Sequence, residues 1–193
     1  MEYLLGATHT DLLDNQNYVP LSFDYNKSAI LQILERIPKT DLVVSCDKNT
    51  ITKISTILGN KLPIHTILYF RMKPDIRSII HIDKNSKDPK AFQATFGLNL
   101  PLANSNSVLM RWYSKKNSDT DLESFVGPNG SPTPSIAEDK VICIDKTYYD
   151  KPLVVKINDW HSVENQSTTN VAQFISLRFV EPIEQIIKVL EEL

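Results

Sequence analysis

Three residues of this chain are of the right types to bind one metal ion together. His81 and Asp83 lie two positions apart in the segment SIIHID, and His161 lies in the later segment DWHSVEN. In an extended strand alternate side chains share a face, so His81 and Asp83 point the same way. If a second strand places His161 beside them, two imidazoles and one carboxylate surround a single site. We therefore predict that these three residues are metal ligands and catalytic residues.

The ligand types indicate which metal would bind. Imidazole and carboxylate suit Fe(II), whereas an all-thiolate set would suit zinc or an iron–sulfur cluster. Three protein ligands on one face also leave open coordination positions for other molecules. The other two of the four histidines fit this pattern less well. His65 is expected to be a hydrogen-bonded residue of a strand, and His9 is expected to face solvent.

Helices are predicted at both ends of the chain. Apolar residues recur at the i, i+3, i+4, i+7 spacing in 27–37 and 48–58, and again in 182–193. Asn26 and Asp47 are suited to accept a hydrogen bond at the start of the first two helices. We expect these helices to pack outside a sheet that holds the metal ligands.

The middle of the chain is rich in β-forming residues separated by turn signals. The expected strands are 42–45, 63–72, 76–83, 92–100, 107–113, 140–144, 153–157 and 171–180. This order predicts a mainly β protein with flanking helices, built as a jelly roll.

One domain is expected to span the whole chain, because 193 residues with 41% hydrophobic content suffice for one sizeable core. We expect 1–60 to be a mostly helical flank, 63–180 the jelly-roll core and 182–193 a C-terminal helix. The helix either closes the core or forms a dimer contact, so the protein is expected to be a monomer or homodimer. The irregular region 114–139 contains several glycines and prolines, and is either a lid or a disordered excursion.

Charge and cysteine usage limit the possible partners. Lys plus Arg number 21 against 23 Asp plus Glu, which gives a net charge of -2 without a basic block. We therefore expect no general nucleic-acid binding. Cys46 and Cys143 lie in apolar settings and form no paired motif. No segment approaches the roughly 20 apolar residues of a membrane span, so we expect a cytoplasmic protein without membrane attachment.

The order of these motifs resembles that of the Fe(II)- and 2-oxoglutarate-dependent dioxygenases. That superfamily shares a double-stranded β-helix, a cupin-like jelly roll, and a His-x-Asp/Glu, His, Arg/Lys order. The matching residues are His81, Asp83, His161 and Arg178. The resemblance extends over about 63–180.

Two further segments resemble one branch of that superfamily. FGLNLPL, which precedes RWY, and WHSVENQS are similar to segments of the aspartyl/asparaginyl hydroxylase-like and phage-type branch. The resemblance implies Fe(II), 2-oxoglutarate as cosubstrate and O2, with oxidative decarboxylation of 2-oxoglutarate to succinate and CO2. It also implies a cosubstrate site, for which the candidates are Arg178 first, then Arg111 and Arg71, with Asn99 and Asn165 adding amide hydrogen bonds.

The chain departs from the branch at the cosubstrate position. A basic residue often stands about ten positions after the distal histidine, but here that position is Val171. Arg178 is an odd number of positions further on, so a regular strand would put the two on opposite faces. Arg178 can therefore reach the site only with a β-bulge or a different register.

The predicted function is an Fe(II)/2-oxoglutarate-dependent oxygenase, a hydroxylase acting on an amino-acid side chain, a peptide or another small polar substrate. One alternative is a cupin-like metal-binding protein that does not use 2-oxoglutarate, such as an isomerase or a binding module. Another is a catalytically inactive barrel that serves in protein interaction. Substrate choice is expected to depend on loops 84–90 and 114–139.

Overall fold

A computed structural model gives the fold. It describes residues 16–38, 43–83, 95–127, 132–179 and 181–191. The helices are α2 Lys27–Leu34, α3 Lys48–Ile57 and α4 Ile183–Glu191, with short 3₁₀ turns η2 Ser105–Ser107 and η3 Glu138–Lys140. The strands are β1 Tyr18–Pro20, β2 Val43–Ser45, β3 Ile64–Met72, β4 Phe96–Ala103, β5 Val108–Lys115, β6 Glu123–Val126, β7 Pro132–Ser135, β8 Val141–Tyr148, β9 Leu153–Lys156, β10 His161–Asn165 and β11 Ala172–Phe179.

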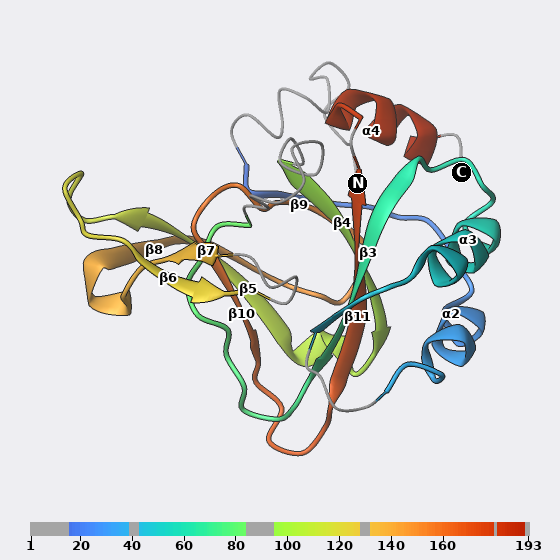
Figure 1. Ribbon diagram of the computed structural model, residues 1–193, viewed down its shortest axis with the longest axis horizontal. Helices are drawn as coiled ribbons and strands as arrows, with labels where there is room; N and C mark the ends of the chain where they lie inside the picture. The colour runs from blue at the N-terminus through green and yellow to red at the C-terminus, as the bar shows by residue number, and fades with distance from the viewer. Residues whose placement is uncertain (1–15, 39–42, 84–94, 128–131, 180, 192–193) are drawn as a thin grey trace.

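Two antiparallel sheets face each other (Figure 1). The large sheet has the order β1-β9-β4-β11-β3-β2, and the small sheet has the order β10-β5-β8. From β3 onward the chain passes between the two sheets at nearly every connection, with segment 76–83 running beside β10 of the small sheet. This winding is a double-stranded β-helix, the jelly roll expected from the sequence.

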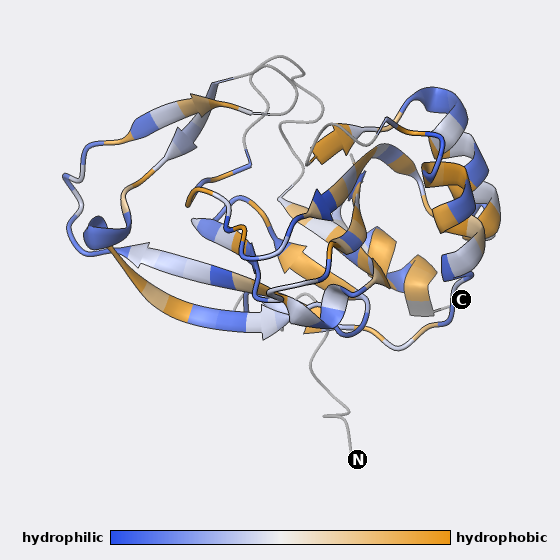
Figure 2. Ribbon diagram, turned by 90° about the horizontal axis from the view of Figure 1, so that it is seen from below, coloured by the Kyte–Doolittle hydropathy of each residue, from blue (hydrophilic) through white to orange (hydrophobic). Residues whose placement is uncertain are grey.

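The helices cover the outer face of the large sheet (Figures 1 and 2). Strand β11 shows how the sheet separates two cores, because successive side chains point to opposite faces. Ile175 and Leu177 pack with the buried residues of the helices, such as Ile30 and Ile54. Phe174 points the other way, into a second apolar cluster between the sheets. The second cluster therefore lies on the face of β11 that is turned toward the small sheet.

The helix starts predicted from the sequence are confirmed. Asn26 Oδ1 accepts a hydrogen bond from Ala29 N at 3.0 Å, and Asp47 Oδ1 accepts one from Thr50 N at 2.7 Å. The amino-terminal flank is not only helical, however. Its strands β1 and β2 form the two edges of the large sheet. No helix within the described ranges is both long and apolar enough to cross a bilayer.

Segment 76–83, which was predicted as a strand, is extended but irregular. It makes isolated bridges to β10 and β7 instead of a continuous ladder. The His81 backbone exchanges two hydrogen bonds with His161, both 2.9 Å long. On the other side, Ile82 N donates to Pro134 O and Ile136 N donates to Ile80 O. The segment is thus held between β10 and the end of the β6–β7 hairpin.

The hairpin of β6 and β7 corrects the prediction of an irregular region at 114–139. Pro132 and Pro134 favoured a loop, because proline cannot donate a backbone hydrogen bond. In the structure Pro134 O accepts from Ile82 N, so the backbone groups of Pro134 point away from β6. Proline at this position therefore removes no hydrogen bond from the hairpin. Residues 128–131, between the two strands, lie outside the described part of the chain.

Candidate metal centre

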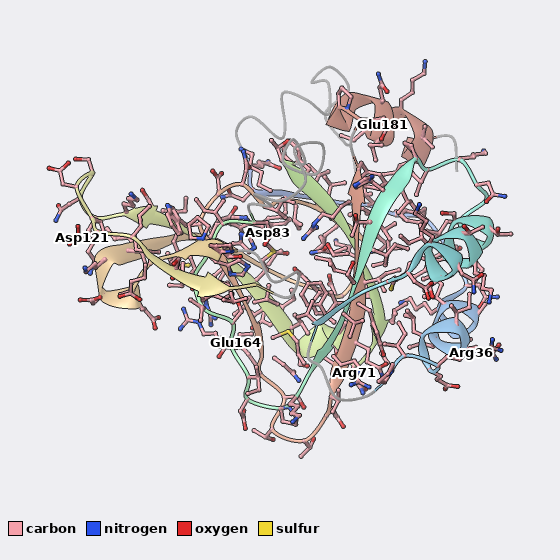
Figure 3. All side chains as sticks on the ribbon, in the orientation of Figure 1. Arg36, Arg71, Asp83, Asp121, Glu164 and Glu181 are labelled. Atoms are coloured by element: carbon pink, nitrogen blue, oxygen red, sulfur yellow. The ribbon has the colours of Figure 1, made fainter. Side chains whose placement is uncertain are left out.

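Backbone pairing brings the two predicted histidine ligands together. His81 and His161 are directly opposite residues in an antiparallel pairing, which places their side chains on the same face. Their ring centroids are 4.5 Å apart. Asp83, two residues after His81, also lies on this face, near the middle of the molecule between the two sheets (Figure 3).

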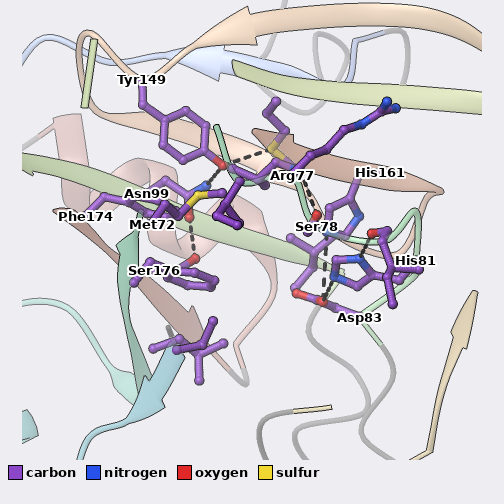
Figure 4. A pocket seen from close by; sticks show the side chains of 18 of the residues that line it. Met72, Arg77, Ser78, His81, Asp83, Asn99, Tyr149, His161, Phe174 and Ser176 are labelled. Carbon is purple, nitrogen blue, oxygen red and sulfur yellow. Dashed lines mark hydrogen bonds and ion pairs between the residues drawn. The ribbon is translucent and has the colours of Figure 1, made fainter. Parts of the chain in front are cut away.

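The three side chains converge on one small region (Figure 4). Asp83 Oδ1 lies 3.2 Å from His81 Nε2 and 3.9 Å from His161 Nε2. One ligand atom from each residue lies within 4.8 Å of the other two. Among the residues that the structure describes, this is the only such group of three or more histidine, cysteine or acidic side chains.

Both imidazoles are oriented by hydrogen bonds at the ring nitrogen that faces away from Asp83. His81 Nδ1 lies 2.7 Å from the Ile79 carbonyl oxygen, and His161 Nδ1 lies 2.9 Å from the Asp159 carbonyl oxygen. A carbonyl oxygen can only accept, so each Nδ1 carries a hydrogen. In a neutral ring Nε2 then has the lone pair, as metal-binding histidines require. The donor set therefore fits a divalent ion.

The electrostatics of the site favour the deprotonated carboxylate. Burial alone would raise the pKa of Asp83, but the hydrogen bond from His81 and the positive charge of Arg178 hold that pKa far below its ordinary value. Burial, followed by the neighbouring charge of His81, lowers the pKa of His161 to about 4. Burial would also lower the pKa of His81, yet the hydrogen bond to Asp83 and its charge raise it overall. At neutral pH Asp83 is thus ionised and His161 is neutral.

Arg178 contacts Asp83, the predicted carboxylate ligand, from the opposite sheet. Its Nη2 lies 2.7 Å from Asp83 Oδ2, the oxygen that does not face the histidines, and its Nη1 donates to Ser176 Oγ. A β-carbon at Gly97 would lie 1.7 Å from Arg178 Nη1. The absence of a side chain at Gly97 is therefore what lets the guanidinium lie against β4 and reach Asp83.

Regular alternation along β11 explains how Arg178 reaches the cavity. Val171 precedes the strand and is 40% exposed. The pairing of β11 with β4 is irregular between Gln173 and Phe174, but the extra residue, Leu102, belongs to β4. Phe174, Ser176 and Arg178 therefore share one face of β11, and all three line the cavity. Arg178 faces the site without a bulge before it in its own strand, because Val171 is not part of that strand.

A line of hydrogen bonds runs from Arg178 along the inner face of the large sheet. Ser176 Oγ donates to Asn99 Oδ1, and Asn99 Nδ2 donates to the Tyr149 hydroxyl at 2.7 Å. The Tyr149 hydroxyl lies 3.0 Å from Met110 Sδ, and burial raises the pKa of Tyr149. Sequence reasoning missed Ser176 and Tyr149. Ser176 could have been found, because it stands two positions before Arg178 on the same strand face.

The triad and this hydrogen-bonded line border one cavity of about 330 Å³ (Figure 4). Its lining residues come from both sheets, from segment 76–83 and from the hairpin. They are Val43, Leu68, Phe70, Met72, Ile76, Arg77, Ser78, Ile79, His81, Asp83, Asn99, Met110, Phe125, Tyr149, Ile157, His161, Val163, Phe174, Ser176 and Arg178.

Three predicted cosubstrate residues do not line this cavity, namely Arg71, Arg111 and Asn165. Arg111 pairs with Glu164 and is not a lining residue, because its neighbours Met110 and Trp112 occupy the inward face of β5. Asn165 is buried, and its amide nitrogen donates to the carbonyl oxygens of Met72, Lys73 and Asn170. It therefore fastens the turns at the end of β10. Of the predicted cosubstrate residues, Arg178 and Asn99 line the cavity.

Comparisons with known proteins give only distant likenesses. No protein-family model and no curated protein sequence matches the chain. Among solved structures, a prolyl-4-hydroxylase of Pseudomonas putida is 8% identical with a TM-score of 0.44, covering 89% of this chain and 97% of that one. A viral collagen prolyl hydroxylase of Paramecium Bursaria Chlorella virus-1, solved as a 2OG complex, is 12% identical with a TM-score of 0.41, covering 87% and 98%. At these TM-scores the likenesses carry no weight for function.

Proposed function

We propose that this protein is an Fe(II)- and 2-oxoglutarate-dependent oxygenase of the aspartyl/asparaginyl hydroxylase-like and phage-type branch. One observation carries the proposal. His81 and His161 turn Nε2 toward Asp83, and both are fixed in that orientation by backbone carbonyls at Nδ1. Two imidazoles and one carboxylate on one face suit Fe(II) and leave positions for a 2-oxo acid and O2.

Bound Fe(II) would supply the oxygen chemistry, and the surrounding residues would orient what reacts there. Overall, O2, 2-oxoglutarate and a substrate C–H group give succinate, CO2 and a substrate hydroxyl. Asp83 presents Oδ1 to the metal position while Arg178 holds Oδ2, so the carboxylate keeps one orientation. Hydrogen bonds to the side chains that bind a metal fix the orientation of those side chains.

Arg178 is the proposed anchor for the remote carboxylate of 2-oxoglutarate. A guanidinium has five N–H donors, and bonds to Asp83 and Ser176 use two of them. The remaining donors can form the paired hydrogen bonds that arginine makes with carboxylates. Asn99 extends the same polar wall. The proposed substrate is an amino-acid side chain, a peptide or another small molecule.

The proposal is tested by measuring turnover of 2-oxoglutarate to succinate without an added substrate. The protein, loaded anaerobically with Fe(II), is given 2-oxoglutarate and then O2, and succinate is measured. We expect slow succinate formation that is lost in Asp83→Ala and retained in Asp139→Asn, a carboxylate change at an exposed position outside the cavity. Equal succinate formation in wild type and Asp83→Ala would contradict the proposal.

The Arg178–Asp83 ion pair also favours a second candidate, a metal-binding protein that does not use 2-oxoglutarate. Arg178 already has a carboxylate partner at 2.7 Å, so it does not need a cosubstrate to balance its charge. In that case the protein would bind Fe(II) or another divalent ion through the same triad. Metal binding by calorimetry, without any effect of 2-oxoglutarate on metal affinity, would favour this alternative.

A further inference from the structure

Most polar side chains that line the cavity already form hydrogen bonds within the protein. Ser78 Oγ accepts from Val163 N at 2.9 Å. Asn99, Tyr149 and Ser176 form the line of hydrogen bonds described above. A ligand group in this cavity would therefore find few side-chain hydrogen bonds beyond the triad and the remaining donors of Arg178.

The other cationic side chain of the lining is also paired. Arg77 Nη1 lies 2.8 Å from Glu138 Oε1, and Arg77 Nη2 donates to the Tyr113 hydroxyl at 2.6 Å. Tyr113 itself bonds to Ser162. Among the described residues Arg77 Nε is the only buried side-chain nitrogen or oxygen without a partner. A single N–H donor beside a neutralised guanidinium gives no counter-charge to an acidic substrate.

The wall beside the triad is apolar. Ile79 is two residues from His81 and is 53% exposed, and Ile76 is 36% exposed. Phe125 of the hairpin stands edge-on to the His81 ring with centroids 5.7 Å apart, and Val163 of β10 lies on the same lining. Large apolar side chains exposed together at a cavity mark a surface that a ligand covers.

The cavity volume limits what enters. About 330 Å³ lies at the lower end of the roughly 300–1,000 Å³ that is usual for ligand pockets. The space holds one small group, and the rest of a larger substrate would stay outside. Apart from the remaining donors of Arg178 and the single N–H of Arg77 Nε, the polar side chains of the lining are already paired. Burying an unpaired polar or charged substrate group beside the apolar wall would therefore be unfavourable.

We propose that the substrate of this site presents an uncharged aliphatic group, which packs against Ile79, Phe125 and Val163 next to the metal ligands. This inference rests on the proposed oxygenase function for the reaction, and on the cavity alone for the ligand class. It specifies which part of the small polar substrate expected from the sequence enters the cavity. The aliphatic group can belong to a free small molecule or to an amino-acid side chain.

The test uses the uncharged fluorophore N-phenyl-1-naphthylamine as a probe for the apolar wall. We compare wild type with Ile79→Asp, Ile79→Leu and the matched control Ile144→Asp. Ile144 is 59% exposed, similar to Ile79, but does not line the cavity. Both aspartate variants replace exposed side chains and should therefore remain folded, which circular dichroism checks.

We expect the probe Kd to rise at least about tenfold in Ile79→Asp, which corresponds to about 1.4 kcal/mol. It should stay within about twofold of wild type in Ile79→Leu and Ile144→Asp. Similar probe binding in Ile79→Asp and Ile144→Asp would overturn the inference.

Competition identifies the ligand class and its source. Displacement of the probe by n-hexanol or by N-acetyl-leucinamide supports the inference and separates a free aliphatic molecule from an amino-acid side chain. Displacement by L-glutamate but by neither of these overturns it. Succinate formation is measured on the same variants. If the proposed oxygenase function is wrong, wild type forms no succinate while the probe binds as expected.

Discussion

The two sheets of this protein differ in regularity. The large sheet has six paired strands and buries one face under three helices, whereas the small sheet has three strands and is extended by the irregular segment 76–83 and a hairpin. The candidate metal ligands all come from the small-sheet side, and Arg178 meets them from the large sheet. The difference indicates that the irregular small-sheet side supplies the candidate ligands, while both sheets contribute to the apolar core.

A large effect on stability is expected on the helix-covered face of the large sheet. Leu177 is fully buried there, so Leu177→Ala should lower the free energy of unfolding by about 2–5 kcal/mol. Ile142 on the small sheet is 56% exposed, and Ile142→Ala should change that free energy by about 0.5 kcal/mol or less. Urea denaturation measures both, and equal losses would contradict the assignment of buried and exposed faces.

The largest expected effect on metal binding lies beside the small sheet. Asp83→Ala removes a proposed ligand, so the affinity for Fe(II) or Co(II) should fall more than about 100-fold. Changes to residues that only hydrogen-bond to a ligand typically cost about 10- to 100-fold. Leu177→Ala should leave affinity nearly unchanged at temperatures where it is folded. Anaerobic calorimetry measures this, with Asp139→Asn as the control, and unchanged affinity in Asp83→Ala would refute the ligand assignment.

Gly97 allows a sharper test of the contact between the sheets. Gly97→Ala should displace the flexible end of Arg178, so it should weaken metal affinity about 10- to 100-fold. The same alanine introduced into Arg178→Ala should have no further effect on affinity, because the two changes act through one contact. Additive losses in this double-mutant cycle would show that Gly97 acts independently of Arg178.

The smallest effect is expected at Arg111. Its ion pair with Glu164 is partly exposed, and such pairs contribute about 0–1 kcal/mol. Arg111→Gln should therefore leave metal affinity and succinate formation unchanged. A loss of metal affinity or succinate formation as large as that in Arg178→Ala would mean that the inner and outer faces of β5 are wrongly assigned.

Much of the site could be predicted because it depends on local strand geometry. Alternation places His81 and Asp83 on one face in any extended segment, even one as irregular as 76–83. The partner strand of His161 could not be read from the sequence, because pairing between distant segments depends on the whole fold. The resemblance to a known order of motifs supplied that expectation.

The proposed cosubstrate residues were harder to predict because their orientation depends on where each strand begins. Arg178 faces the cavity because β11 begins after Val171 and alternates regularly from Ala172 to Arg178. No sequence pattern marks that strand start. For Arg111 a signal was present, because the apolar neighbours Met110 and Trp112 already indicate that it faces outward. The β7 prolines were misleading, since Pro134 lies where proline removes no hairpin hydrogen bond.

The most direct test of the proposed site is an anaerobic absorption titration with Fe(II) and 2-oxoglutarate. If His81, Asp83 and His161 hold one iron that also binds the 2-oxo acid, wild type should develop the weak visible charge-transfer band of that chelate. Each single alanine variant of the three should lose the band. A full band in His161→Ala, or no band in wild-type protein that binds Fe(II), would contradict the account.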